Sequence, residues 1–166
     1  MSLHEIALSE LNFNPFEKIG KDWFLVTAGD EKGFNTMTAS WGFMGVIWGK
    51  NVFETVVRHN RYTYEFMEKN DLFTISFFDE ADRDALKFCG AHSGRDCDKV
   101  KETGLTPIFT EGTTAFEEAK LVFVCRKLYD GDIDLEKLNC DERTKWYGSD
   151  PVHKQYIGEI VKVLAK

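Results

Sequence analysis

The chain has 166 residues, of which 43% are hydrophobic, 30% charged and 14% aromatic. This length suits one domain spanning residues 1–166, and the apolar share speaks against long disorder. Acidic residues outnumber lysine and arginine by 28 to 21, so the formal net charge is −7. A surface of that sign repels phosphate backbones, and we therefore expect no nucleic-acid partner.

No segment of the sequence has the character of a membrane span. The longest nearly uninterrupted apolar run, Trp41 to Gly49, is far shorter than the ~18 residues that a spanning helix needs. The first residues carry neither a basic region nor an apolar core, so we expect a cytoplasmic protein without a membrane partner. The four cysteines form no C-x-x-C pair. That spacing excludes a zinc knuckle or a thioredoxin-type site, and free thiols are the expected state.

Strand signals dominate the first half of the chain. Runs rich in aromatic and β-branched residues, and apolar runs of strand length, predict strands separated by glycine-containing turns. The predicted strands are Asp22–Ala28, Phe34–Ser40, Phe43–Trp48, Asn51–Arg58, Leu72–Phe78, Leu121–Tyr129 and Gln155–Leu164.

Three short helices are expected between these strands. The first covers Arg61–Asn70, with Asn60 as its N-cap. The second covers Asp79–Cys89, whose acidic start favours a helix N-terminus, and the third covers Gly94–Thr103 and ends at Gly104. A mostly-β chain with short inserted helices favours a closed barrel, because closure removes the exposed edges of the strands.

A polar stretch, N-T-M-T-A-S-W-G at residues 35–42, occupies one predicted strand and its exit. Hydroxyl and amide groups are costly to bury unless each finds a partner. The pattern fits cross-strand threonine pairs, a purely structural arrangement, and it equally fits a polar wall for a planar ligand with many acceptor atoms. In the second case Trp41 is the tryptophan best placed in the sequence to stack on that ligand.

Two further clusters suit an anion. In R-H-N-R-Y-T, residues 58–63, two arginines and a hydroxyl meet a helix N-terminus, and arginine forks and free N–H groups match phosphate oxygens. A solvated basic loop is the alternative, although a local positive cluster is unusual in a chain of −7. Ser93 and Gly94, followed by Lys99, form a second candidate arm, for which an ordinary serine cap with helical charge pairs is the alternative. Rossmann and P-loop motifs are absent from the sequence.

Four motifs together resemble one known family. N-T-M-T-A-S-W-G, R-H-N-R-Y-T-Y-E, L-F-T-I-S-F-F and C-G-A-H-S-G-R-D-C-D-K occur in the order found in the flavin reductase-like family, and the flavoredoxin branch is the most similar. The resemblance runs from about Lys18 to Y-I-G-E-I-V near the C-terminus. It implies a Greek-key split β-barrel that binds FMN, usually as a homodimer with the flavin near the subunit interface.

The same resemblance implies which residues would form the flavin site. The isoalloxazine ring and ribityl chain would contact Met37, Thr38, Ala39 and Ser40, with Asn35 and Trp41 flanking them. The phosphate would lie near Arg58, Arg61, Tyr62 and Thr63. Ribityl and phosphate contacts would be completed by Ser93, Gly94 and Lys99. His153 stands where many flavin reductases carry a G-D-H histidine on the nicotinamide side. Here the segment reads G-S-D-P-V-H, with two extra residues before the histidine, which is a departure from the family pattern.

These features predict an FMN-dependent oxidoreductase that takes a hydride from NAD(P)H and passes electrons to free flavin, a ferric complex, a quinone or another protein. The flavin itself carries hydride chemistry, so no catalytic side chain is expected. One alternative is an FMN electron carrier reduced by a protein partner, since an acidic surface suits a basic partner. Another is a non-redox module for a different phosphate-bearing ligand.

Two remaining features carry no clear chemistry. His4, His59 and His92 lack partners at metal-ligand spacing, so no metal site is expected. The acidic segment Asp130 to Glu142 fits a solvated connection between late strands, or alternatively a cover over the flavin site of a partner subunit.

Overall fold

A computed structural model describes residues 2–166 of the chain. The strands are β1 (His4–Glu5), β2 (Phe24–Asp30), β3 (Gly33–Ala39), β4 (Gly42–Ile47), β5 (Lys50–Arg58), β6 (Leu72–Phe77), β7 (Pro107–Thr110), β8 (Thr113–Phe116), β9 (Leu121–Asp132) and β10 (His153–Ala165). The α-helices are α1 (Pro15–Glu17), α2 (Tyr62–Lys69), α3 (Arg83–Ala91), α4 (Lys99–Thr103) and α5 (Cys140–Tyr147). Turns of 3₁₀ helix occupy Leu8–Glu10, Glu80–Asp82 and Leu135–Lys137, and a π-helical turn occupies Lys18–Asp22.

The strand order requires the main sheet to curl on itself. The order is β3-β2-β6-β9-β10-β5-β4, with β1 added on β10, and β7 pairs separately with β8. β3 is the first strand in this order and β4 is the last, although only Ser40 and Trp41 separate them in the chain. A three-residue step spans at most ~11 Å, whereas the ends of a flat sheet of this size would lie roughly 29 Å apart. The sheet therefore forms a barrel, and within residues 2–166 no ladder joins β3 to β4, so the barrel is split there.

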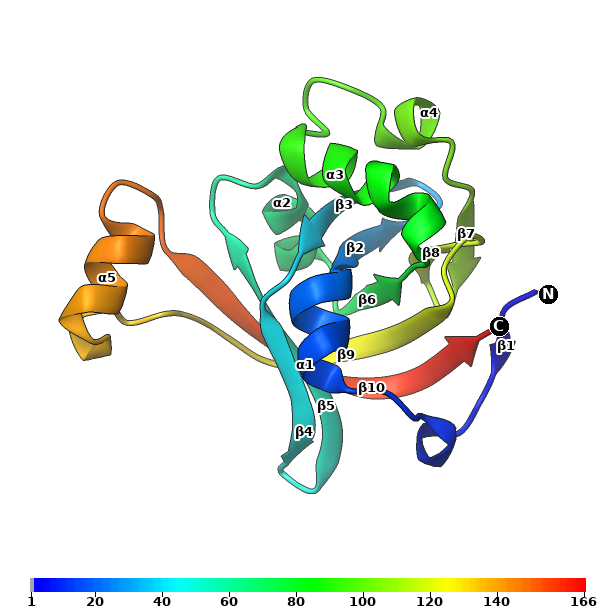
Figure 1. Ribbon diagram of the computed structural model, residues 1–166, viewed down its shortest axis with the longest axis horizontal. Helices are drawn as coiled ribbons and strands as arrows, with labels where there is room; N and C mark the ends of the chain where they lie inside the picture. The colour runs from blue at the N-terminus through cyan, green and yellow to red at the C-terminus, as the bar shows by residue number, and fades with distance from the viewer. Residues whose placement is uncertain (1) are drawn as a thin grey trace.

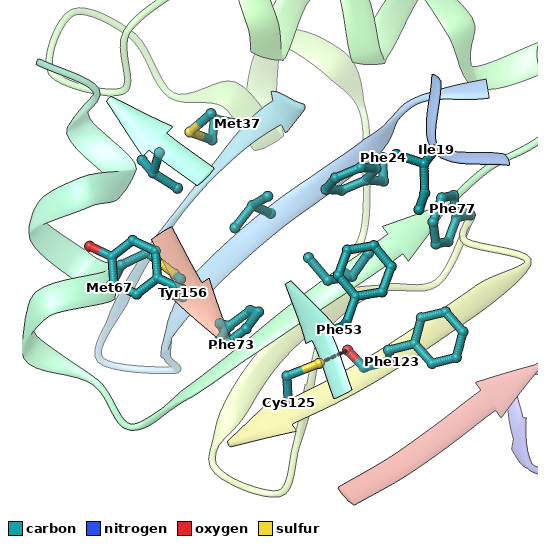
Figure 2. Packing of buried hydrophobic residues seen from close by; sticks show 14 of the residues in the cluster. Ile19, Phe24, Met37, Phe53, Met67, Phe73, Phe77, Phe123, Cys125 and Tyr156 are labelled. Atoms are coloured by element: carbon teal, nitrogen blue, oxygen red, sulfur yellow. Dashed lines mark hydrogen bonds between the residues drawn. The ribbon is translucent and has the colours of Figure 1, made fainter. Parts of the chain in front are cut away.

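Aromatic side chains fill the barrel. Phe53 is fully buried, and its ring centroid lies 5.5 Å from that of Phe24, 5.9 Å from that of Phe123 and 6.3 Å from that of Phe77. Figure 2 shows these rings converging from strands that are distant in the sequence. Their tilted and edge-on contacts are the favoured geometries of aromatic pairs. This core explains the long apolar runs in the sequence.

Helices and hairpins extend from the barrel in different directions. Figure 1 shows α2 and α3 beside β3 at one end, while the β4–β5 hairpin projects away from the opposite end. α5 stands apart from the barrel, beyond the ends of β9 and β10. No helix within residues 2–166 is long and apolar enough to cross a bilayer. The four cysteines are free thiols.

The predicted strands are all present, and the mostly-β class with short inserted helices is confirmed. Boundaries differ by a few residues, and the β7–β8 hairpin was not predicted. The acidic segment at residues 130–142 is not simply a connection: β9 continues to Asp132 and α5 begins at Cys140. α5 has no buried residue, so no apolar periodicity marks it in the sequence.

Two helix starts were predicted wrongly. Asn60 is not an N-cap, because Arg61 N–H donates to the Arg58 carbonyl in a turn and the helix begins only after Arg61. Gly94 does not open a helix either. The short α4 begins at Lys99, where the Asp98 carboxylate accepts from a backbone N–H as a true N-cap. Gly104 ends it at φ 74°, as expected for a glycine C-cap. The predicted second helix divides into the Glu80–Asp82 turn and α3.

Candidate functional site

A pocket opens at the split between β3 and β4, and we call it the barrel pocket. Its volume is about 240 Å³. The lining side chains come from β3, the β3–β4 link, β5, the turn before α2, the end of α5 and the start of β10: Met37, Thr38, Ala39, Ser40, Trp41, Val56, Arg58, Arg61, Trp146 and His153.

A second hollow, the loop pocket, adjoins the first at Arg61. It measures about 150 Å³ and is lined by Asn35, Asn60, Arg61, Tyr62, Thr63, Gly90, Ala91, His92, Ser93 and Lys99. A third hollow of about 400 Å³ lies against α3 and shares Thr38, Ala39 and Ser40 with the barrel pocket. It also shares Gly90 and Ala91 with the loop pocket. The three hollows meet along β3 and together provide the room that cofactor sites require.

The sequence left two roles open for the polar residues of β3, a structural cross-strand pair or a wall for a ligand, and the structure shows both. Thr36 and Thr27 face each other across β3 and β2, with their hydroxyls 2.8 Å apart in the interior. Thr36 therefore forms a structural cross-strand pair. Thr38 lies further along β3 and lines the barrel pocket, while its hydroxyl donates to the Leu86 carbonyl of α3. Thr38 thus helps to hold α3 against the pocket wall.

Arg61 is a half-buried cation whose hydrogen bonds are incomplete. Its Nη1 donates to the Gly90 carbonyl at 3.2 Å. Its Nη2 is buried and has no hydrogen-bond partner in the described part of the chain. Burial also lowers the pKa of the Arg61 guanidinium, because the charged form loses its hydration. A buried guanidinium without a counter-charge is costly unless an anion reaches it.

Lys99 adds a second buried cation to the loop pocket. It is only 6% exposed, and its Nζ donates to the carbonyls of Thr36 and Cys89 at 2.7 and 2.9 Å. An ammonium has three N–H donors, so one remains for another acceptor. Burial lowers the pKa of Lys99, and the nearby Arg61 charge lowers it further. No carboxylate of residues 2–166 forms an ion pair with either cation.

The side of the loop pocket formed by Asn35, Tyr62 and Thr63 depends on a close packing contact with Gly94. Asn35 is buried, and its Nδ2 donates to the Thr63 hydroxyl at 2.7 Å. A Cβ on Gly94 would lie 2.0 Å from Asn35 Oδ1 and 2.9 Å from the Tyr62 ring, so only glycine allows this approach. Gly94 itself lines an adjoining hollow, which shares Asn35, Tyr62 and Lys99 with the loop pocket. Ser93 lines the loop pocket, and its hydroxyl accepts from the Arg95 N–H in a tight turn.

Arg58 shares the barrel pocket with Arg61 but does not line the loop pocket. It lines the barrel pocket, and its guanidinium donates to the carbonyls of Pro151 at 2.6 Å and Trp146 at 3.1 Å. These bonds attach the end of α5 to the end of β5. Among the predicted residues, Arg58 thus anchors a neighbouring segment, while Arg61, Tyr62, Thr63, Ser93 and Lys99 gather around the loop pocket.

The open side of the barrel pocket is aromatic. Trp146 meets Trp41 edge-on, with ring centroids 4.7 Å apart, and His153 lies 5.3 Å from Trp41. His153 is 8% exposed. Burial and the Arg58 charge lower its pKa to about 4, so it is neutral at physiological pH.

Several lining residues were not predicted. Gly90, Ala91 and His92 line the loop pocket and lie within the C-G-A-H-S-G motif. Their position in that motif could have identified them as site residues. Val56 is one of many apolar strand residues, and nothing in the sequence distinguishes it. Trp146 lies in a segment without apolar periodicity, so its role emerges only from its contact with Trp41.

The geometry thus defines a class of protein: a split antiparallel barrel with a pocket beside its opening that is lined by two cations and suits an anion. A family model described as flavin reductase like domain matches residues 16–166, and the chain belongs to that family. This match confirms the resemblance seen in the sequence motifs. No curated protein matches the sequence.

Solved structures agree with this fold. Flavoredoxin of Desulfovibrio vulgaris (Miyazaki F) superposes with a TM-score of 0.69 at 22% identity, over 98% of this chain and 77% of that chain. An FMN-binding domain of a flavin reductases-like enzyme from Shewanella baltica OS155 gives 0.69 at 16% identity, over 98% and 76%. Nitrilotriacetate monooxygenase component B from Bacillus cereus gives 0.66 at 17% identity, over 96% and 80%. At such identities the likeness establishes the fold alone.

Proposed function

We propose that the chain binds FMN and uses it to pass reducing equivalents from NAD(P)H to an acceptor such as free flavin, a ferric complex, a quinone or another protein. The observation that carries this proposal is a pair of cations, the half-buried Arg61 and the buried Lys99, which line one pocket without a carboxylate partner in the described chain. A phosphate group in the loop pocket would lie against the Arg61 guanidinium and accept the third N–H of Lys99. The family and the FMN-binding descriptions of the similar structures support the same ligand.

The remaining lining residues suit the rest of FMN. Thr38, Ala39 and Ser40 border both the barrel pocket and the hollow against α3, so they would lie along the ribityl chain and the ring. When bound, FMN supplies reversible two-electron redox chemistry. The chain would bind the phosphate, orient the ring and exclude water. Trp41, Trp146 and His153 border the side from which a reduced nicotinamide would approach. The four free thiols fit a reducing, cytoplasmic setting.

A visible absorption spectrum of the purified protein tests this proposal directly. The spectrum should be repeated after FMN is added and washed out. We expect flavin bands to remain, because the phosphate contacts slow dissociation. A protein that is colourless in both samples would overturn FMN binding, and retention of another phosphate-bearing ligand would favour the non-redox alternative.

The source of electrons is tested under anaerobic conditions with the FMN-loaded protein. Addition of NADH or NADPH should bleach the flavin absorbance. The net charge of −7 favours a second candidate, an electron carrier that docks on a basic redox protein. If neither nicotinamide bleaches the flavin, the hydride-accepting role is wrong and the carrier role takes its place.

We also propose that the chain forms a homodimer through the β4–β5 hairpin. β4 is an end strand of the sheet and exposes Phe43 and Val46, the latter by 73%. The turn between β4 and β5 exposes Trp48 by 59%. An exposed apolar edge strand is a site of association unless another chain covers it. The projection of this hairpin from the barrel in Figure 1 leaves it accessible to a second copy.

Charge on this hairpin should separate the subunits. The double variant Val46→Glu/Trp48→Glu is expected to shift the protein from dimer to monomer, since two carboxylates would be buried in the interface. Sedimentation equilibrium at micromolar concentration measures the change. The control Lys87→Glu/Lys69→Glu places two carboxylates on α3 and α2, changes the net charge by −4 rather than −2, and should still leave the dimer intact. A wild-type protein that sediments as a monomer would contradict the dimer.

A further inference from the structure

The end of α5 forms a polar cluster with the start of β10. No residue of α5 is buried, and Figure 1 shows the helix standing apart from the barrel. Its last turn is nevertheless fixed, because Arg58 binds the carbonyls of Trp146 and Pro151. This attachment places the Tyr147 hydroxyl 2.7 Å from Nδ1 of His153. A residue far from the flavin motifs in the sequence thus contacts a histidine that lines the barrel pocket.

The surroundings of His153 keep its imidazole neutral. Arg58 is its register partner on β5, and the positive guanidinium disfavours a second cation beside it. Asp150 is the one acidic group that acts in the opposite direction, and it is largely exposed. Tyr147 is the remaining titratable neighbour, and burial raises the pKa of its phenol, so it stays protonated. The imidazole therefore carries a single proton, on Nδ1 or on Nε2.

The hydrogen bond to Tyr147 decides between these two tautomers. A phenol is a stronger acid than a neutral imidazole, and an imidazole nitrogen is a stronger base than a phenol oxygen. The bond from the Tyr147 O–H to Nδ1 is consequently the stronger of the two arrangements, and it leaves the proton of His153 on Nε2. Nε2 has no hydrogen-bond partner among residues 2–166. It is also not one of the fully buried side-chain atoms without a partner, so it keeps some accessible surface. Because His153 lines the barrel pocket, we infer that this N–H is available to a ligand there.

We propose that Tyr147 is a positioning residue that holds His153 in the Nε2–H form, so that His153 donates a hydrogen bond to a carbonyl or carboxamide oxygen of the second substrate. The choice of reduced nicotinamide as that substrate rests on the proposed function. In this arrangement His153 acts as a neutral donor and transfers no proton.

The tautomer can be read directly by ¹⁵N NMR of the imidazole in the FMN-loaded protein without nicotinamide. In the wild type at pH 7 we expect a protonated Nε2 and an unprotonated Nδ1, unchanged as the pH falls to about 5. In Tyr147→Phe we expect a mixture of tautomers, because the O–H that favours one of them is gone, while burial and the Arg58 charge still keep the imidazole neutral at pH 7. A proton on Nδ1 in the wild type, or an unchanged tautomer in the variant, would overturn the proposal.

Kinetics test the donor role separately. Tyr147→Phe should raise KM for the reduced nicotinamide by about 2- to 12-fold, which corresponds to one ordinary hydrogen bond, with kcat and FMN affinity little changed. Tyr64→Phe is the matched control, because Tyr64 also lies beside a histidine, His59, but lines neither pocket. An unchanged KM would overturn the donor role. Failure of both nicotinamides to reduce the flavin would overturn the proposed function instead, and the NMR result on the tautomer would stand.

Discussion

Arg61→Ala is expected to lower the affinity for FMN by roughly 10- to 150-fold, because a charge-assisted hydrogen bond contributes about 1.5–3 kcal/mol. Riboflavin lacks the phosphate, so its affinity should barely change. The difference arises from the Arg61 guanidinium, which lines the loop pocket and forms no ion pair with a carboxylate of the described residues. Fluorescence quenching of each flavin, titrated with protein, measures both dissociation constants.

A matched arginine separates this effect from a general loss of charge. Arg95 is more exposed, pairs with Glu65 and does not line the loop pocket, so Arg95→Ala should affect FMN much less. Arg61→Lys should fall between the wild type and Arg61→Ala, since it keeps the charge but loses the planar fork. An equal loss of FMN and riboflavin in Arg61→Ala would show that the loop pocket is not the phosphate arm.

The barrel could be predicted from the sequence because its strands carry their own signals. Apolar runs such as Leu72–Phe78 are buried on both faces in the structure, and glycines mark the turns between strands. The gathering of Arg61, Thr63 and Lys99 around one pocket could be predicted too, although only through motifs whose order matched a known family. Spacing alone would not have joined Lys99 to Arg61, since the chain between them forms β6 and α3.

The rest of the site depends on contacts that no local pattern records. Arg58 and Arg61 both line the barrel pocket, yet Arg58 binds the end of α5 while only Arg61 also lines the loop pocket. α5 was not predicted, because it has no buried face and is held by backbone carbonyls. Trp146 and Tyr147 acquire their roles from Trp41 and from His153, which belong to other segments.

Phe53→Ala is expected to lower the free energy of unfolding by about 3–5 kcal/mol, the usual cost of removing a buried phenylalanine. Phe53 has no exposed surface and contacts rings from β2, β6 and β9, as Figure 2 shows, so the surrounding strands cannot collapse easily into the cavity. Urea denaturation should show a lower midpoint with an unchanged slope. Val161→Ala, on an exposed part of β10, is the control and should stay within about 0.5 kcal/mol of the wild type.

The stability of Phe53→Ala can also be used to measure FMN binding at the site. Phe53 lies on the inner face of β5, whereas Val56 and Arg58 alternate to the outer face and line the barrel pocket. FMN at about 100 times its dissociation constant should restore about 2.7 kcal/mol to Phe53→Ala, because the ligand binds only the folded chain. At the same FMN concentration, Phe53→Ala/Arg61→Ala should recover much less. Equal recovery in both variants would mean that FMN stabilises the protein without the loop pocket.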